Sequence, residues 1–242
     1  MTIEGGKARG SAGWKLALGT GLIGALIGGG AVAFSSRQSA QSGAAIRDYL
    51  LENPEVITEA MQRLQDRNAA SIVAAHRAAL ETPFAGAWAG AADGDVVLVE
   101  FFDYACGYCR KSNADIERLL AEDPKLKVVW REWPVLGPDS EAAARASLAA
   151  AQAGRFKPFY DRLFAAGRPT PETLAEARSA VGLAADLPAA AADQELAKNF
   201  RLAQALEATG TPTFVVGDRI LQGAVGYEAL RDAVKEARAR KS

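Results

Sequence analysis

Apolar residues recur along this chain with helical spacing in some stretches and strand spacing in others. From Ala44 to Leu80 they return every three or four positions, which forms one apolar face along an amphipathic helix. Asn53-Pro54 interrupts this stretch, so we expect two helices with a bend between them. Such a stripe needs a surface to cover it, either the rest of the chain or copies of the same segment.

Two apolar runs of strand length follow, and a helical pattern separates them. Asp95 to Phe102 is rich in β-branched and aromatic residues, as is Leu126 to Val135. Between them, Cys106 to Glu122 has apolar residues on one helical face and ends at Asp123-Pro124. Strand, helix and strand of these lengths form a βαβ unit, so we expect two parallel strands.

The rest of the chain is predicted to be helical apart from one hairpin. Asp139 to Phe200 is rich in alanine, and glycine and proline divide it into three or four helical segments. Thr213 to Val216 and Arg219 to Gln222 are joined by Gly217-Asp218, which predicts a β-hairpin. Tyr227 to Arg240 then predicts a final helix.

The N-terminal residues indicate export. Lys7, Arg9 and Lys15 precede an uncharged, glycine-rich stretch from Leu16 to Phe34, and a small polar linker follows to Gly43. This stretch fits a cleaved signal peptide with a cut near Ala33. It also approaches the ~20 residues that span a bilayer. In both cases the basic flank stays in the cytoplasm and the remainder is exported to the periplasm, anchored by residues 16–34 or released after cleavage.

Composition supports a folded protein with no nucleic-acid partner. Of the 242 residues, 49% are hydrophobic and 24% are charged, so a core is expected rather than disorder. The 28 basic and 29 acidic residues nearly balance, which gives no reason to expect binding to a polyanion.

The only two cysteines, Cys106 and Cys109, form one Cys-x-x-Cys motif. A disulfide between them closes almost no loop, so it contributes little to stability. A zinc site would need two further ligands, and His76, the only histidine, has no partner residues at a useful spacing. We expect His76 to be half-buried on a helix and the cysteines to perform redox chemistry.

The position of the motif assigns a role to each sulfur. Cys106 lies at the start of the predicted helix, where unpaired N–H groups and the helix dipole stabilise an anion. Arg110 and Lys111 add positive charge nearby. We therefore expect a partly exposed Cys106 with a lowered pKa to be the attacking thiolate. Cys109, one turn further in, is the resolving thiol.

Flanking motifs resemble a known family. The residues from Val99 to Tyr104 before the Cys-x-x-Cys, the run from Trp133 to Pro138, and the helical block before Thr211-Pro212 resemble the DsbA-like branch of the thioredoxin superfamily. The Asn53-Pro-Glu segment looks like the N-terminal region of ScsC-type proteins, linked to suppression of copper sensitivity.

The resemblance implies an α/β thioredoxin fold with an inserted helical domain at about residues 139–200. It divides the chain into a signal or anchor segment with its linker at 1–40, a helical oligomerisation arm at 41–82, and a DsbA-like domain at 83–242. No cofactor is expected.

The resemblance also implies roles for further residues. Thr211-Pro212 is implied to be a cis peptide that faces the disulfide and pairs with the substrate backbone. Glu100 matches the buried acid beneath the redox helix, where it exchanges a proton with Cys109. The alternative is a structural Glu100 that reaches solvent or pairs with a lysine.

The dipeptide between the cysteines departs from the strongest oxidases of that family. Gly107 and Tyr108 stand where those oxidases have proline and histidine. Loss of the imidazole is expected to make the disulfide less oxidising. Threonine before the proline, at Thr211, is similar to the isomerase and reductase members.

Three functions remain open. The first is an exported protein disulfide isomerase or reductase, associated as a dimer or trimer through residues 44–80 and kept reduced by a membrane redox partner. The second is a monomeric dithiol oxidase that donates disulfides to exported proteins with cysteines. The third is a copper-tolerance protein in which Cys106 and Cys109 bind Cu(I) as soft ligands.

Overall fold

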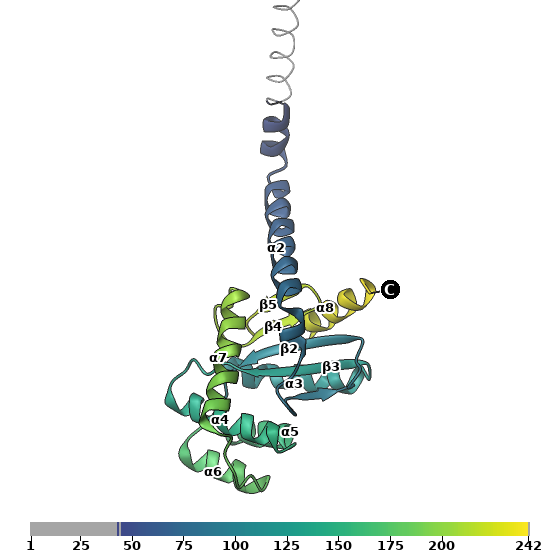
Figure 1. The fold of residues 1–242 in the computed structure, drawn as a ribbon. Coiled ribbons are helices and arrows are strands. Elements are labelled where there is room, and N and C mark those ends of the chain that lie inside the picture. Colours follow the sequence, from purple (N-terminus) through teal and green to yellow (C-terminus); the bar gives the residue numbers. More distant parts are fainter. Residues whose placement is uncertain (1–42, 44, 242) are drawn as a thin grey trace, which may run out of the picture. The chain divides into compact units, whose positions relative to one another are not determined.

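The computed structural model describes residues 43 and 45–241 (Figure 1). The predicted signal or anchor at residues 16–34 lies outside this range. Among the described residues, no helix combines the length and the apolar character needed to cross a membrane. The chain divides into two compact units, residues 1–62 and 63–242, and each is described by itself.

In the first unit, the predicted bend lies at Asn53-Pro54. Residues 45–52 are helical, and helix α2 (Glu55–Glu81) begins after the break. The side chain of Asn53 donates a hydrogen bond to the carbonyl oxygen of Tyr49 at 2.9 Å, so it caps the end of the first helix. Five large apolar side chains of this unit are at least half exposed: Ile46, Tyr49, Leu51, Ile57 and Met61.

The second unit contains a five-stranded sheet in the order β1-β3-β2-β4-β5. Strands β2 (Val96–Phe102) and β3 (Leu126–Glu132) are parallel, as predicted from the βαβ pattern. Strands β4 (Thr213–Val216) and β5 (Arg219–Gln222) form the predicted hairpin, and β4 lies antiparallel to β2. The edge strand β1 (Trp88–Gly90) was not predicted, because three residues are too few to establish an alternating pattern.

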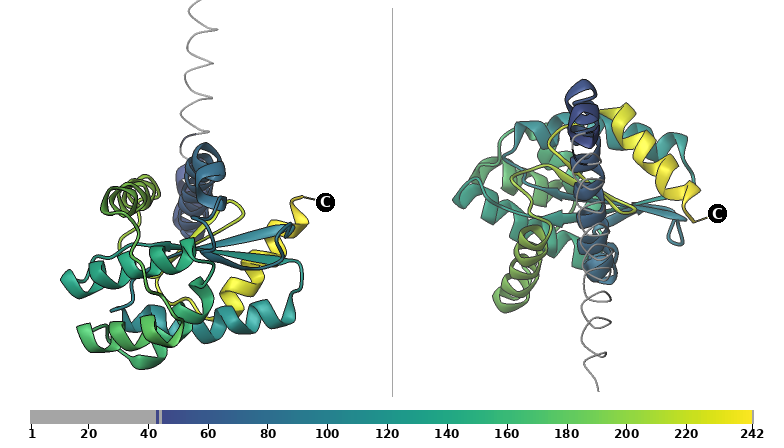
Figure 2. Two further views of the ribbon diagram at one scale, coloured as in Figure 1. Left: turned by 60° about the horizontal axis from the view of Figure 1, so that its bottom comes forward. Right: turned by 90° about the horizontal axis from the view of Figure 1, so that it is seen from above.

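Helices cover both faces of the sheet (Figure 2). Helices α3 (Gly107–Glu122) and α8 (Tyr227–Ala239) bury Ile116 and Leu230 on one face. On the other face, Val73 and Leu80 of α2 are 1% and 0% exposed and pack in the cluster that contains Phe101 and Val129 of the sheet.

The end of α2 is therefore part of the core of the second unit. Residues 63–81 belong to the same compact unit as the sheet. Within the predicted arm at residues 41–82, residues 45–52 and 55–81 are helical, and residues 63–81 contact the core of the second unit. Periodicity identified the apolar face of α2 but not the surface that covers it.

A buried arginine on β3 fixes the end of α2. Arg131 is 1% exposed, and its guanidinium donates to the carbonyl oxygens of Leu80 at 3.1 Å and Thr82 at 2.6 Å. It also forms an ion pair with Glu195 at 3.3 Å and donates to Asn199 at 2.9 Å. These contacts satisfy C-terminal carbonyl groups of α2 that would otherwise be buried without donors.

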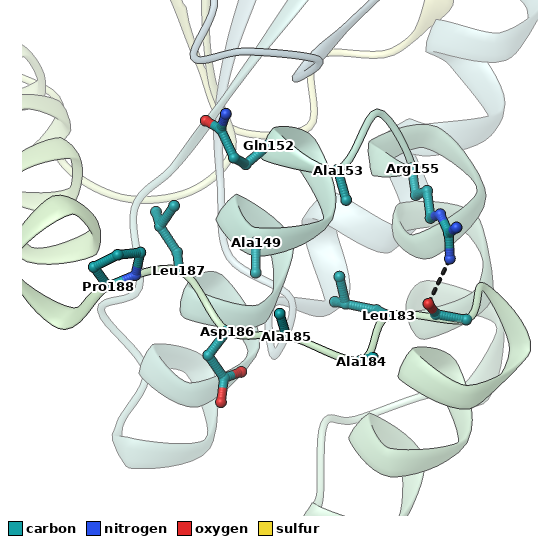
Figure 3. Close-up of a pocket in the computed structure, with 11 residues that line it drawn as sticks. Ala149, Gln152, Ala153, Arg155, Leu183, Ala184, Ala185, Asp186, Leu187 and Pro188 are labelled. Carbon is teal, nitrogen blue, oxygen red and sulfur yellow. Dashed lines mark hydrogen bonds between the residues drawn. The ribbon is translucent and has the colours of Figure 1, made fainter.

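The predicted helical block consists of four helices, α4 (Pro138–Gln152), α5 (Phe156–Ala166), α6 (Pro171–Ala180) and α7 (Ala189–Ala205), with breaks at the expected glycines and prolines. A pocket of about 370 Å³ lies beside the connection between α6 and α7 (Figure 3). The guanidinium of Arg155 donates to the carbonyl oxygens of Val181 and Gly182 at its rim. Neither cysteine lines this pocket.

Candidate redox site

The cysteine pair lies where β2 passes into α3. Cys106 is the N-cap residue of α3 with an extended backbone, and its N–H donates to the carbonyl oxygen of Asp103 at 3.0 Å. Cys106 is 6% exposed, so it is more enclosed than predicted, and Cys109 is fully buried. Both are free thiols in this structure. A Cβ atom at Gly107 would meet no neighbour within 4 Å, and Tyr108 is 68% exposed.

The two sulfurs have opposite pKa shifts, as their predicted roles require. The pKa of Cys106 is lowered to about 5, first because the Cys109 thiol donates a hydrogen bond to its sulfur. The Thr211 side chain and the backbone N–H groups of Cys109 and Tyr108 lower it further. Burial raises the pKa of Cys109 far above its ordinary value, so Cys109 stays protonated.

In contrast to our prediction, Arg110 and Lys111 do not stabilise the Cys106 thiolate by their charge. The guanidinium of Arg110 donates to the carbonyl oxygen of Phe164, at 3.2 Å, and so binds the C-terminal end of α5. Lys111 is exposed to solvent. Hydrogen bonds, rather than the charges of these residues, stabilise the Cys106 thiolate.

The Thr211-Pro212 peptide is cis, as the resemblance implied. It lies beside Cys106, whose sulfur is 3.2 Å from the carbonyl oxygen of Thr211. The hairpin holds this turn, since Gly223 N–H donates to the carbonyl oxygen of Pro212 at 2.8 Å. Residues more than a hundred positions apart thus meet at one site.

Glu100 is completely buried on β2, so it neither reaches solvent nor forms an ion pair with a lysine. Burial raises its pKa to about 8. The indole of Trp130, directly opposite on β3, and the hydroxyl of Tyr160 partly offset this rise. The negative charge of Glu100 in turn raises the pKa of Cys109, so the two groups interact electrostatically.

Asp103 is a site residue to which sequence reasoning assigned no role. It is 2% exposed, and its carboxylate accepts hydrogen bonds from the backbone N–H groups of Ala105, Val135 and Leu136 at 2.8, 2.8 and 3.0 Å. It therefore joins the turn before Cys106 to the loop after β3. The only local signal was an aspartate directly after a strand, a position typical of turns.

His76 and the cysteine pair are the residues that the sequence raised as candidate metal ligands. His76 is half-buried on α2, as expected. Within residues 45–241, no group of three or more histidine, cysteine or acidic side chains is arranged to hold a metal ion. The two sulfurs remain the candidate ligands for Cu(I).

Comparisons with known proteins agree with this geometry. Residues 97–235, more than half of the chain, match the family described as DSBA-like thioredoxin domain. Residues 38–71 match the copper resistance protein ScsC N-terminal domain. Curated relatives include a Na(+)/H(+) antiporter NhaA 1 from Salinispora arenicola, which is 30% identical over 169 residues and 61% of this chain. The chain spans about a quarter of that antiporter's length, 24%.

Several solved structures align with most of this chain and with nearly the whole length of their own chains. A thioredoxin-like oxidoreductase from Silicibacter pomeroyi is 40% identical, with a TM-score of 0.62 over 67% of this chain and 96% of its own. A Proteus mirabilis ScsC linker-deletion mutant is 29% identical, with a TM-score of 0.68 over 84% and 96%. A periplasmic thioredoxin-like protein from Salmonella enterica is 27% identical, with a TM-score of 0.63 over 67% and 95%. The chain belongs to the DsbA-like thioredoxin domain family and carries an ScsC-type N-terminal segment.

Proposed function

We propose that this protein is an exported thiol–disulfide oxidoreductase that reduces and isomerises disulfides of protein substrates through Cys106 and Cys109. One observation carries the proposal. The Cys106 sulfur, with its pKa lowered to about 5, lies at the start of α3 and 3.2 Å from the carbonyl oxygen that precedes cis-Pro212. A stable thiolate beside the cis-proline turn is suited to attack a disulfide in an extended chain.

The reaction proceeds by two exchanges. The Cys106 thiolate attacks one sulfur of a substrate disulfide, forming a mixed disulfide and releasing the other sulfur as a thiolate. In isomerisation, a substrate thiolate then attacks the mixed disulfide and regenerates the Cys106 thiolate. In reduction, Cys109 attacks Cys106, the second substrate sulfur leaves, and two electrons have passed from the dithiol to the substrate.

Glu100 is proposed to accept the proton that Cys109 must lose before it attacks. With a pKa of about 8, about a tenth of Glu100 is ionised at pH 7, so both forms are available for transfer in either direction. Glu100→Gln keeps the shape and removes the acceptor. It should slow resolution of the mixed disulfide about 10-fold or more without unfolding the protein. An unchanged rate across neutral pH would make Glu100 structural.

The dithiol oxidase remains the second candidate, because a low pKa of Cys106 itself favours the reduced form and so a more oxidising disulfide. Tyr108 and Thr211 support the isomerase or reductase. The redox state of the two cysteines, trapped in the exporting cell, separates the candidates. A reduced pair supports the first, which requires a membrane partner to supply electrons, and an oxidised pair supports the second.

Substrate contact is tested with Cys109→Ala. This variant lacks the resolving thiol, so mixed disulfides with exported proteins should accumulate at Cys106. Cys106→Ala is the matched control and should give none. If Cys109→Ala captures no protein but the reduced protein binds Cu(I) tightly, the copper-tolerance function takes first place.

We further propose that residues 45–62 associate with copies of themselves as a dimer or trimer. Five of their large apolar side chains are at least half exposed, whereas residues 63–81 contribute Val73 and Leu80 to the core. Deletion should therefore stop at Gln62, because removal of Leu80 would expose the face of the sheet that it covers. Sedimentation of the chain from residue 43 onward should show an oligomer, and the chain from residue 63 onward a monomer with less isomerase activity. A monomer in both cases would favour the oxidase.

A further inference from the structure

We propose that Tyr160 is a positioning residue for the redox reaction, whose hydroxyl acts as a hydrogen-bond switch between Glu100 and Asn113. Three elements bring these side chains together: Glu100 lies on β2, Tyr160 on α5 and Asn113 on α3. The tyrosine belongs to the helical block, so the switch links this block to the proton chemistry of the cysteines. The inference rests on the proposed role of Glu100 as proton acceptor.

One hydroxyl proton serves two acceptors at unequal distances. The Tyr160 hydroxyl lies 2.7 Å from Oδ1 of Asn113 and 3.4 Å from Oε2 of Glu100. A hydroxyl has a single proton, so it can donate a strong hydrogen bond to only one of them at a time. The short distance shows that it donates mainly to Asn113 in this structure.

The protonation state of Glu100 decides which acceptor receives the proton. A protonated Glu100 can donate to the hydroxyl oxygen of Tyr160, which leaves the tyrosine proton for Asn113. An ionised Glu100 attracts the tyrosine proton, because a hydrogen bond to a carboxylate is stronger than one to an amide. The Asn113 amide can then turn and present its NH₂ group to the tyrosine oxygen.

The surroundings hold the ring of Tyr160 in place, so the switch moves only its hydroxyl proton and the half-buried Asn113 amide. Tyr160 is 1% exposed, and its ring lies 4.8 Å from the ring of Phe164, 5.1 Å from Trp130 and 5.2 Å from Phe102, measured between centroids. Such packing fixes the ring, while rotation of the hydroxyl requires no change of volume. The indole of Trp130, opposite Glu100 on β3, also lowers the pKa of Glu100, and its N–H has no other acceptor among the described residues.

The remaining titratable groups around Glu100 do not replace Tyr160. Cys106 and Cys109 are the reacting sulfurs of α3, and each disfavours the ionised form of Glu100 when it is itself an anion. Tyr104, from the loop after β2, shares a hydrogen bond with Ser147 at 2.9 Å. Tyr160 is therefore the hydroxyl that stabilises the Glu100 carboxylate, and it increases the fraction of Glu100 able to accept the Cys109 proton.

The test measures the pKa of Glu100 directly, by carbon-13 NMR of the reduced protein with labelled glutamate, together with the pH profile of mixed-disulfide resolution. Tyr160→Phe should raise the pKa of Glu100 by about one unit and move the pH profile of mixed-disulfide resolution to higher pH by the same amount. Tyr104→Phe removes another buried hydroxyl from the same aromatic cluster and should move neither. Asn113→Ala removes the competing acceptor and should lower the pKa of Glu100.

The outcomes separate this inference from the proposed function. An unchanged Glu100 pKa in Tyr160→Phe, or an equal shift in Tyr104→Phe, would overturn the switch. If the Glu100 pKa rises but the resolution profile stays in place, the switch holds and the proposed role of Glu100 as the base fails. If Tyr160→Phe does not fold, the half-buried Asn113→Ala decides alone, and an unshifted or raised Glu100 pKa then refutes the switch.

Discussion

The carboxylate of Asp103 accepts a hydrogen bond from the backbone N–H of Val135, 32 residues further along the chain, at 2.8 Å. Its other oxygen accepts from the N–H of Ala105, in the turn that leads to Cys106. One buried side chain therefore connects the ends of two parallel strands beside the cysteine pair. On the second loop, Val135 and Leu136 expose 45% and 47% of their surface.

Asp103→Asn is predicted to loosen this connection. The amide has one oxygen for three backbone donors, so N–H groups lose their acceptor. We expect the free energy of unfolding to fall by about 2–4 kcal/mol, measured by denaturant titration. Asp93→Asn, at an exposed position, is the control and should change it by less than about 0.5 kcal/mol. If Asp103→Asn also changes the free energy of unfolding by less than about 0.5 kcal/mol, the two loops do not depend on the carboxylate for their stability.

The pKa of Cys106 should depend on Cys109 more than on any nearby cation. In the wild-type reduced protein, thiolate absorbance should titrate near pH 5, and alkylation at pH 6 should label Cys106 and spare Cys109. Cys109→Ala removes the strongest hydrogen bond to the thiolate, so the Cys106 titration should move to higher pH. Lys111→Ala, at an exposed position, should leave it in place. If Lys111→Ala shifts the Cys106 titration more than Cys109→Ala does, the nearby positive charge, as the sequence suggested, is the main cause of the low pKa.

The same pKa links redox state to pH. The folded pKa of Cys106 is below its unfolded value of about 9. This thiolate therefore stabilises the reduced fold fully above pH 9, and the contribution is lost as pH falls through 5. The reduced protein should lose stability relative to the oxidised protein on acidification from pH 9 to 5, as thermal unfolding of both forms would show.

Several elements could be predicted because their signals are local. The buried strands β2 and β3 are continuous apolar runs, and the breaks between α4, α5, α6 and α7 fall at glycines and prolines, which interrupt helices locally. The start of α3 was predictable from the same strand-to-helix transition. This placement was enough to assign opposite roles to Cys106 and Cys109.

Other features depend on contacts between distant residues. The hydroxyl of Tyr160 reaches Glu100 across 60 positions, and no local pattern marks either residue of that pair as a partner. The apolar stripe of α2 is continuous in sequence, yet Ile57 is exposed and Leu80 is in the core. Amphipathic spacing shows that a face will be covered, but it does not identify the covering surface.

Tyr108→His is predicted to make the disulfide more oxidising. Tyr108 is 68% exposed, so the substitution should not disturb packing. An imidazolium beside the Cys106 thiolate stabilises the reduced form, and about 1.4 kcal/mol of such stabilisation raises the reduction potential by about 30 mV. Equilibration with glutathione measures the change. Tyr108→Phe, which offers no charge, is the control and should keep the wild-type potential, and a histidine variant with that same potential would contradict the argument.

Glu132 is a second buried carboxyl whose ionisation should affect stability. It is 1% exposed, and burial raises its pKa to about 7, while Ser147 donates to Oε1 at 2.8 Å and Arg131 partly offsets the rise. A free glutamate has a pKa of 4.5. Between these values the folded protein binds more protons than the unfolded chain, so its stability falls as pH rises from about 4.5 to 7. The full effect is about 3 kcal/mol.

Glu132→Gln should remove this dependence, because the amide keeps an oxygen for Ser147 and cannot ionise. Relative to wild type, the variant should gain about 3 kcal/mol in the free energy of unfolding as pH rises from 4.5 to 8. The denaturant titrations use the oxidised proteins, in which the cysteines cannot ionise. Glu100 is present in both proteins, so its ionisation cancels in the comparison. Glu176→Gln, at an exposed position, should follow the wild-type profile. A constant difference between Glu132→Gln and wild type over this range would mean that Glu132 is already ionised in the fold, with Arg131 nearby to balance its charge.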